Sequence, residues 1–414
     1  MTGLLHHRRA RMRGRDPHES HRSATPLELL FDLTFVVAFG MAADELAHFL
    51  AEDHVKTALL GFGFATFAIS WAWINFSWFA SAYDTDDWIF RLTTMLQMVG
   101  VIVLALGLPD MFESIDAGHT VDTGVMVAGY IVMRVALVFQ WARAARQDPS
   151  RRAACTTYIK AILVAQAGWV ALLVADTSVA ATFAFAGLLI LVECTGPWIA
   201  ETRKGGTPWH AHHIAERYGL LVIIALGEGI IGTIASLSVL VGPEGPGWSM
   251  DAALVALAGI GLTFGMWWVY FVVPSGAVLH VHRKRAFRWG YGQIPIIGAV
   301  VGTGGGLHVA AYFLEHRSQL DASATVLCVV IPVAVYVVGI FVLYAVLTRT
   351  LDRFHLWLLA ATVVPLAAPI ALASAAASMP WCLVVLSLSP WVTVVGYELR
   401  GHEHNRRVLE QLAS

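Results

Sequence analysis

Long apolar runs alternate with short polar segments over almost the whole chain. Each run is long enough to cross the hydrocarbon of a bilayer as a helix, which takes about 20 residues. A helix is the expected form because an unpaired backbone amide in lipid costs several kcal/mol. The pattern predicts twelve spans, at 27–50, 57–80, 88–108, 122–143, 154–175, 178–199, 214–240, 250–273, 288–313, 323–347, 354–375 and 378–398.

The composition supports a protein embedded in lipid. The chain is 57% hydrophobic and 14% charged, whereas a soluble domain carries about 25% charged residues. The predicted fold class is therefore all-α, a polytopic transmembrane helix bundle whose main partner is the lipid bilayer. The net charge of −2 gives no indication of a nucleic-acid partner.

Lysine and arginine are concentrated on one set of alternate loops. These loops are 143–152, 201–210, 280–288, 347–355 and 400–407. The loops between them, such as 108–122 and 241–251, are acidic. Because basic loops stay in the cytoplasm, we expect both termini to be cytoplasmic, with a basic arm at 1–24 and a tail at 401–414.

The two halves of the chain share an order of features. Glu28 opens the first span and Glu216 the seventh, a tryptophan-rich segment follows in each half, and then Arg91 or Arg288 begins the next span. We interpret 25–205 and 206–400 as two six-helix halves in a parallel pseudo-repeat. The alternative is chance recurrence in apolar sequence.

A G-x-G-x-x-G pattern occurs at Gly227, Gly229 and Gly232. In a dinucleotide-binding protein this pattern follows a strand in a soluble βαβ unit. Here it lies within a predicted membrane helix, where small residues allow helices to approach closely. We therefore predict no nucleotide, and no other cofactor.

Several ionisable residues lie within the predicted spans, where each costs about 2.5–3.5 kcal/mol near the bilayer centre. Glu28 and Asp32 are four residues apart and share one helix face. Glu228 is expected near the midplane of its helix. The candidate ligand- or ion-binding residues are Glu28, Asp32, Arg91, Arg134, Glu193, Glu216, Arg217 and Glu228.

Arg134 stays charged at any depth, so we expect it to need a buried carboxylate. Asp32 or Glu228 is the natural partner, and the sequence does not choose between them. The charges are either structural ion pairs that fix helix register or the lining of a polar cavity. Trp71 and Trp73 are core packing or the wall of such a pocket.

A metal site is not predicted. His212 and Glu216 have a helical spacing of four that could bind a metal, but no H-E-x-x-H motif is present. The four cysteines are far apart and lie in or beside apolar runs, which indicates neither a zinc site nor a disulfide framework.

Four segments resemble one bacterial family: "ELLFDLTFVVAFG", "DTDDWIFRLTTML", "AERYGLLVIIALGEGIIG" and "RWGYGQIPIIGAVVG". Together they are similar to the low temperature requirement A (LtrA) family over about residues 24–400. The resemblance implies a multi-pass protein of the bacterial inner membrane and a cold-growth phenotype, but no settled reaction. Its pattern falls on Glu28, Phe31, Asp32, Glu216, Arg217, Gly219, Gly227 and Glu228; Leu30 and Gly229 depart from it.

Three functions are compatible with these features. The first is a secondary transporter or ion or proton pathway that uses Asp32 and Glu228 as protonatable or ion-binding groups. In it Arg134 is the counter-charge, and Glu28, Glu216 and Arg217 form an inner vestibule for protons, ions or a small polar solute. The second is a membrane-embedded enzyme acting on a lipid or isoprenoid, and the third is a scaffold or sensor in cold adaptation. We favour the first and name no catalytic residue; the oligomeric state is not predicted.

Overall fold

The computed structural model describes residues 10–17, 19, 22–242, 247–350 and 352–413. Within these ranges the secondary structure is helical, apart from one isolated β-bridge between Thr120 and Ser178. Twelve of the described helical segments are long and apolar enough to cross a membrane. They coincide with the predicted spans to within five residues, except that the third and eighth run on to 117 and 281 instead of 108 and 273. The predicted all-helical, multi-span fold class is confirmed.

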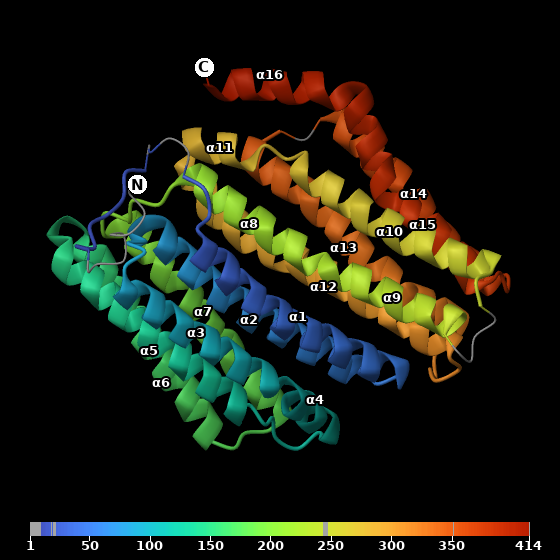
Figure 1. Cartoon of the computed structure of the whole chain (residues 1–414), viewed down its shortest axis with the longest axis horizontal. Coiled ribbons are helices and arrows are strands. Elements are labelled where there is room, and N and C mark those ends of the chain that lie inside the picture. Colours follow the sequence, from blue (N-terminus) through green and yellow to red (C-terminus); the bar gives the residue numbers. More distant parts are fainter. Residues whose placement is uncertain (1–9, 18, 20–21, 243–246, 351, 414) are drawn as a thin grey trace, which may run out of the picture. The chain divides into compact units, whose positions relative to one another are not determined.

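The helices form two compact units, and α1, α2 and α8 contribute to both. Unit 1 comprises residues up to 41 and 68–217, and unit 2 comprises 42–67 and 218–414. Figure 1 labels the helices, which are α1 (Pro26–Ala51), α2 (Val55–Tyr83), α3 (Trp88–Leu106), α4 (Leu108–Ala117), α5 (Gly124–Gln147), α6 (Arg152–Val174), α7 (Val179–Arg203), α8 (Ala211–Ala225), α9 (Gly227–Val241), α10 (Met250–Phe271), α11 (Ser275–Val281), α12 (Ala286–Leu314), α13 (Ala322–Thr348), α14 (Arg353–Ser374), α15 (Met379–Gly396) and α16 (His402–Ala413).

The predicted division into halves lies between the sixth and seventh spans. The observed units differ from it, because residues 42–67, where α1 ends and α2 begins, belong to unit 2. The parallel six-helix halves at 25–205 and 206–400 therefore stay a prediction. Short connections, η1 (Pro149–Arg151), η2 (Arg283–Arg285) and η3 (Tyr397–Gly401), complete the chain.

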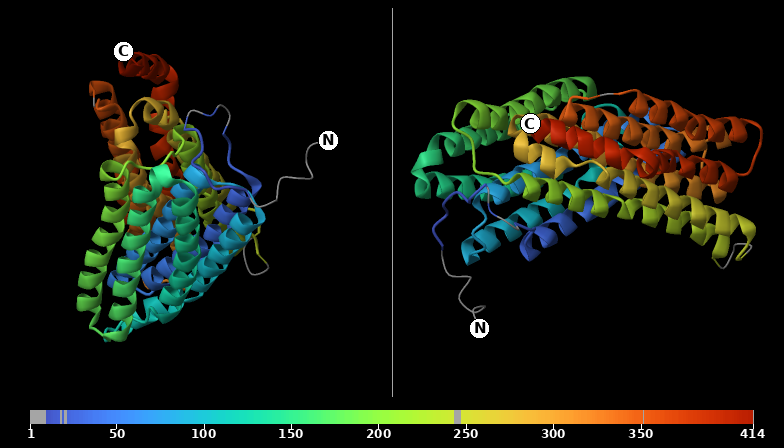
Figure 2. Two further views of the ribbon diagram at one scale, coloured as in Figure 1. Left: turned by 90° about the vertical axis from the view of Figure 1, so that its left-hand side faces the viewer. Right: turned by 90° about the horizontal axis from the view of Figure 1, so that it is seen from above.

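Within unit 1, helices α5, α6 and α7 lie side by side (Figure 1, Figure 2). Helix α3 approaches α5 closely, because Gly100 and Gly129 face each other. A Cβ atom on Gly100 would lie 2.6 Å from the carbonyl oxygen of Gly129. In lipid, apolar side chains gain little by contacting another helix instead of lipid tails. Small residues such as these glycines let two helix backbones approach, and this close packing holds the helices together.

Within unit 2, α12 is the central helix. An 18-residue stretch of its span, Arg283–Leu314, is 83% buried, more than the corresponding stretch of any other span in the described part of the chain. The predicted glycine pattern lies on the adjacent helix α9, after a single non-helical residue, Leu226, that separates it from α8. The prediction that these glycines belong to a helix rather than a nucleotide loop is confirmed.

Candidate functional site: three buried charge clusters

The first cluster comprises Glu28 and Asp32 on α1, and His213 and Arg217 on α8. All four side chains are fully buried within unit 1. The sequence fixes Glu28 locally through a capping box: its backbone N–H donates to Thr25 Oγ1 at 3.3 Å, and the Thr25 N–H donates to Glu28 Oε2 at 2.8 Å.

Arg217 joins the two carboxylates of the first cluster. Its Nη1 lies 2.8 Å from Glu28 Oε1, and its Nη2 donates to Asp32 Oδ1 at 2.5 Å. Trp73 Nε1 donates to the same Asp32 oxygen at 2.7 Å, and His213 Nε2 lies 3.3 Å from Glu28. The second Asp32 oxygen, Oδ2, is buried and has no hydrogen-bond partner among the described residues.

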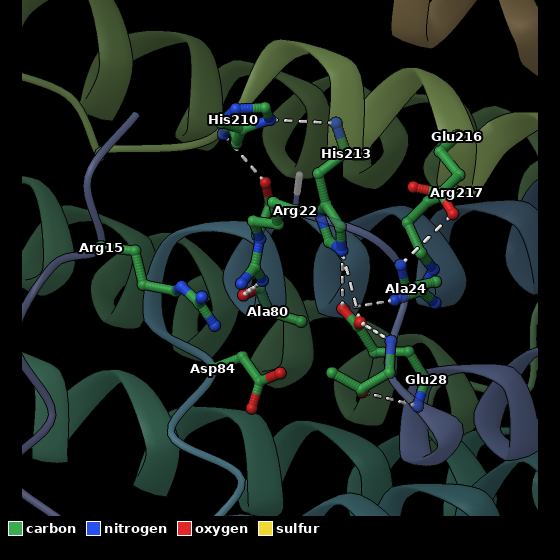
Figure 3. A network of polar contacts seen from close by, with 12 residues as sticks. Arg15, Arg22, Ala24, Glu28, Ala80, Asp84, His210, His213, Glu216 and Arg217 are labelled. Carbon is green, nitrogen blue, oxygen red and sulfur yellow. Dashed lines mark hydrogen bonds and ion pairs between the residues drawn. The ribbon is translucent and has the colours of Figure 1, made fainter. Parts of the chain in front are cut away.

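The first cluster holds two carboxylates against one guanidinium, which leaves one excess negative charge when His213 is neutral. Figure 3 shows Glu28, His213 and Arg217 converging below the turn of α8. An unbalanced charge in a buried site is costly, so this cluster favours uptake of one proton or cation.

Polar groups at the helix ends surround the first cluster without removing this excess. Arg15, Arg22 and Asp84 lie beside the cluster (Figure 3). Arg15 pairs with Glu19, while Arg22 acts on Glu28 as well as on Asp84 and Glu19. The enlarged group of four acids and three arginines still carries one excess negative charge when all of them are ionised. Burial raises the pKa of Asp84 to about 6, and the charge of Glu28 adds to the rise.

His210, the residue directly before α8, lies next to the first cluster and is hydrogen-bonded to His213. Burial lowers the pKa of His210, so the ring is neutral near pH 7. Its Nδ1 accepts the backbone N–H of His213 at 3.2 Å, and its Nε2 lies 2.9 Å from the Glu19 carbonyl oxygen. The accepting Nδ1 places the proton on Nε2, which donates to Glu19.

The second cluster, also in unit 1, is an ion pair between Arg134 on α5 and Glu193 on α7. Arg134 Nη2 donates to Glu193 Oε2 at 2.9 Å. Trp71 Nε1 donates to the same oxygen at 2.6 Å, while Tyr130 and Trp169 donate to Oε1 at 3.3 Å each. One cation meets one anion, and four donors satisfy the carboxylate, so this cluster has a structural role.

The expectation that Arg134 pairs with Asp32 or Glu228 is wrong, because its partner is Glu193. The position of Glu193 along its own helix could not reveal this partner. Helices α5 and α7 both pack on α6, and this packing brings Arg134 and Glu193 together.

The third cluster lies in unit 2 and comprises Glu228, which is buried, His308, which is partly buried, and Asp44, whose side chain is 63% exposed. Asp44 Oδ1 lies 3.3 Å from His308 Nδ1, and the charge of Asp44 acts on Glu228. Glu228 is 2% exposed, and its carboxylate has no hydrogen bond or ion pair with any described residue. A buried carboxylate without a cation or donor is again a group that favours a proton.

Two predicted residues lie outside the clusters. Arg91 pairs with Asp86 at 2.8 Å, and both side chains are 38% exposed. Glu216 is exposed and accepts the Ala24 N–H at 3.4 Å. Asp32 belongs to unit 1 and Glu228 to unit 2, and a cavity shared by these two acids stays a prediction.

The sequence reasoning did not identify several of the partners. His213 stands four residues before Arg217, so the helical period places both on one face of α8. The T-x-x-E motif at Thr25 would have identified Glu28 as a capping residue whose second oxygen is not used by the cap and can meet a cation. Asp44 and His308 are far apart in the chain, and no local pattern relates them.

Comparison with known proteins adds a family but no activity. The model of the family "Bacterial low temperature requirement A protein (LtrA)" matches residues 23–389. The chain is also similar to an uncharacterized protein of Rhizobium meliloti (strain 1021), with 26% identity over 320 residues, or 71% of this chain and 70% of the relative. No solved structure matches the chain significantly.

Proposed function

Because the chain belongs to the bacterial low temperature requirement A family of multi-pass membrane proteins, we propose that it is a secondary transporter or proton pathway of the inner membrane. The first cluster, Glu28, Asp32, His213 and Arg217, is its proton-binding site. The observation that supports this proposal is the ratio of two buried carboxylates to one buried arginine.

The excess charge is best neutralised by a proton. A bare ion such as Na⁺ or Ca²⁺ needs several oxygen ligands, and Ca²⁺ takes six to eight in proteins. Arg217 already occupies one oxygen of each carboxylate in the first cluster. Glu28 Oε1 accepts no hydrogen bond but lies in ion-pair contact with Arg217, whereas Asp32 Oδ2 has neither, so this one oxygen is the acceptor that suits a proton.

Protonation gives the first cluster two states. With Asp32 ionised, Arg217 is shared between both carboxylates and holds α8 against α1 at two points. With Asp32 protonated, Arg217 and Glu28 form a neutral pair and the second contact weakens. A proton thereby changes the strength of a helix–helix contact, which is what coupling of proton binding to a conformational step requires.

The third cluster supplies a second proton acceptor in unit 2. Glu228 is buried without a partner, and His308 and Asp44 are titratable neighbours in the same unit. In this proposal Arg134 is a structural residue rather than the counter-charge of the pathway, because Glu193 neutralises it.

Proton flux through liposomes that contain the purified protein tests the proposal. A pH-sensitive dye is trapped inside, a pH gradient is imposed, and the membrane potential is clamped with a potassium ionophore. We expect the wild-type protein to collapse the gradient faster than protein-free liposomes do. Asp32→Asn should reduce that excess rate at least about tenfold, which corresponds to about 1.4 kcal/mol.

The matched control is Asp86→Asn, which neutralises a half-exposed carboxylate at the foot of α3. It should keep the wild-type rate. A wild-type rate equal to that of protein-free liposomes, or an Asp32→Asn rate equal to that of wild type, contradicts the proposal.

A further inference from the structure

The N-terminal arm carries arginine at every second position. The sequence "ARMRGRD" at 10–16 has no regular secondary structure, and the Arg13 N–H donates to the Arg11 carbonyl oxygen at 3.0 Å, which forms a three-residue turn around Met12. Met12 is fully buried, whereas Arg11 and Arg13 on either side of it are exposed. The arm therefore presents Arg11 and Arg13 outward and Met12 to the protein, while Arg15 is half-buried.

The arm is held in this position by its backbone. The N–H of Ala10 donates to Asp87 Oδ2 at 2.9 Å, and the N–H of Met12 donates to Gln147 Oε1 at 2.6 Å. The N–H of Gly14 donates to Asp148 Oδ2 at 3.3 Å. Because side chains at the ends of α3 and α5 fix the backbone, the outward face of the arm is fixed too.

The outward face borders a cavity of about 560 Å³ within unit 1. Four arginines line it, Arg11, Arg13 and Arg15 from the arm and Arg151 from η1, and Asp148 is the one acidic residue among the lining residues. The volume is in the range of small-ligand sites, about 300–1,000 Å³. A lining with four cations and one anion selects for negative charge.

The arginines of the cavity are not all occupied. Arg15 forms an ion pair with Glu19 at 2.7 Å, while Arg11 donates to the Gln147 carbonyl at 3.3 Å and Arg151 donates to that of Gly205. The Arg13 guanidinium has no hydrogen bond or ion pair with a described residue. Arg13 is thus free to take an external anion, and Arg11 and Arg151 keep donors to spare.

We propose that this cavity binds a phosphate-bearing anion. The planar fork of the guanidinium group matches phosphate oxygens in a bidentate fashion, and several arginines around one space are the usual arrangement for it. The phosphate is that of an anionic phospholipid headgroup or of a soluble compound. This binding site does not depend on the proposed proton pathway.

Two probes on the purified full-length protein test the site and identify the source of the phosphate. The first is phosphatidylglycerol, followed as lipid retained by the protein in a mass spectrum recorded under native conditions. The second is inorganic phosphate, followed as a rise in the thermal unfolding midpoint against chloride at equal ionic strength. We expect at least one probe to bind the wild-type protein; lipid alone indicates a headgroup, and phosphate alone a soluble anion.

The principal variant is Arg13→Gln, because this side chain makes no contact that the fold needs. It should weaken binding of the active probe about tenfold, as expected for loss of one charge-assisted contact. The triple variant Arg11→Gln, Arg13→Gln, Arg151→Gln should abolish it. The matched control removes three exposed arginines elsewhere, Arg400→Gln, Arg406→Gln and Arg407→Gln, and should bind as wild type does.

Three outcomes would overturn the proposal. One is a wild-type protein that binds neither probe. Another is an Arg13→Gln variant with unchanged binding. The third is a control variant that loses as much binding as the triple variant, since the effect would then come from overall charge.

Discussion

Asp32 and Glu193 are both buried acids in unit 1, and each meets an arginine and a tryptophan N–H. They differ in charge balance. Glu193 is the single counter-charge of Arg134, whereas Asp32 shares Arg217 with Glu28. The same chemical change at the two positions should therefore have different consequences.

The first prediction concerns this pair of acids. Glu193→Gln leaves Arg134 buried without a counter-charge and should lower the free energy of unfolding by about 3–5 kcal/mol. Asp32→Asn keeps an acceptor for Trp73 and leaves a neutral Arg217–Glu28 pair, so its effect should stay within about 1 kcal/mol. Thermal or denaturant unfolding in detergent compares the two variants. Equal losses of unfolding free energy in the two variants would show that charge balance does not distinguish the first cluster from the second.

The second prediction concerns pH and rests on Asp84, in the loop between α2 and α3. Burial, with the nearby charge of Glu28, raises the pKa of this group from 3.8 to about 6. The folded protein thus binds the proton more tightly than the unfolded chain does. Stability is unaffected below about pH 4, falls as the pH rises through the window from 4 to 6, and above it is lower by about 3 kcal/mol.

Asp84→Asn removes this dependence, because an amide carries no charge and can still accept the Asp86 N–H. The variant should unfold at the same temperature as the wild type near pH 4 and at a higher temperature near pH 8. Arg15, Arg22 and Glu28, the charged groups that act on Asp84, are present in both proteins. A difference between the two proteins that is independent of pH would refute the assignment.

At this scale the sequence predicted the burial of Glu28, Asp32 and Glu228, but neither that of Asp84 and Asp87 nor the partners of the buried acids. Burial follows from apolar neighbours along the chain, as for Glu28, Asp32 and Glu228. Pairing depends on which helices become neighbours and on where each helix ends. Arg134 meets Glu193 because α5 and α7 both pack on α6, and no pattern along the chain shows that packing.

At the scale of helices, the three glycines of the G-x-G-x-x-G pattern occupy different surroundings. A Cβ atom on Gly232 would lie 2.6 Å from the Gly304 carbonyl oxygen, so α9 and α12 touch there through their backbones. A Cβ atom on Gly227 would have no neighbour within 4 Å. A Cβ atom on Gly229 would lie 2.8 Å from Thr263 Oγ1 on α10, so the pattern contains two close helix contacts.

The third prediction follows from these two positions. Gly232→Ala should destabilise the protein by about 1–3 kcal/mol, because the backbone of α12 cannot yield as a flexible side chain would. Gly227→Ala should be neutral or stabilising by up to about 1 kcal/mol, since alanine favours the helix. Unfolding midpoints of both variants, measured side by side in one detergent, provide the comparison. A loss at Gly227 as large as that at Gly232 would contradict the interpretation.

The helices themselves were predictable because a membrane span needs about 20 mainly apolar residues and must pair its backbone groups within a helix. Their order and approximate bounds therefore follow from hydropathy alone. The docking of the arm was not predictable in the same way. It depends on single hydrogen bonds from Ala10 and Met12 to the ends of α3 and α5, and no repeating pattern in the sequence predicts such bonds.

At the scale of the whole molecule, hydropathy determines the number of crossings, but only the distribution of charge orients them. The basic loops predict that the side bearing 201–210 faces the cytoplasm and the side bearing 108–122 faces outward. An even number of spans then brings both termini to the cytoplasmic side. This orientation determines which compartment, the cytoplasm or the outside, supplies protons to the first cluster and anions to the arginine cavity.

The last prediction tests that orientation by labelling single cysteines in intact cells. The native cysteines Cys155, Cys194, Cys328 and Cys382 are first replaced by alanine. His119→Cys and Lys204→Cys then place thiols at exposed positions in loops that should lie on opposite sides of the membrane. A maleimide that does not cross membranes should label the first in intact cells and the second only after permeabilisation. The reverse labelling pattern would mean that the predicted orientation is inverted. The end of unit 1 that holds Asp84 and Glu28 would then face the outside, and Asp84, with its pKa of about 6, would respond to external acid.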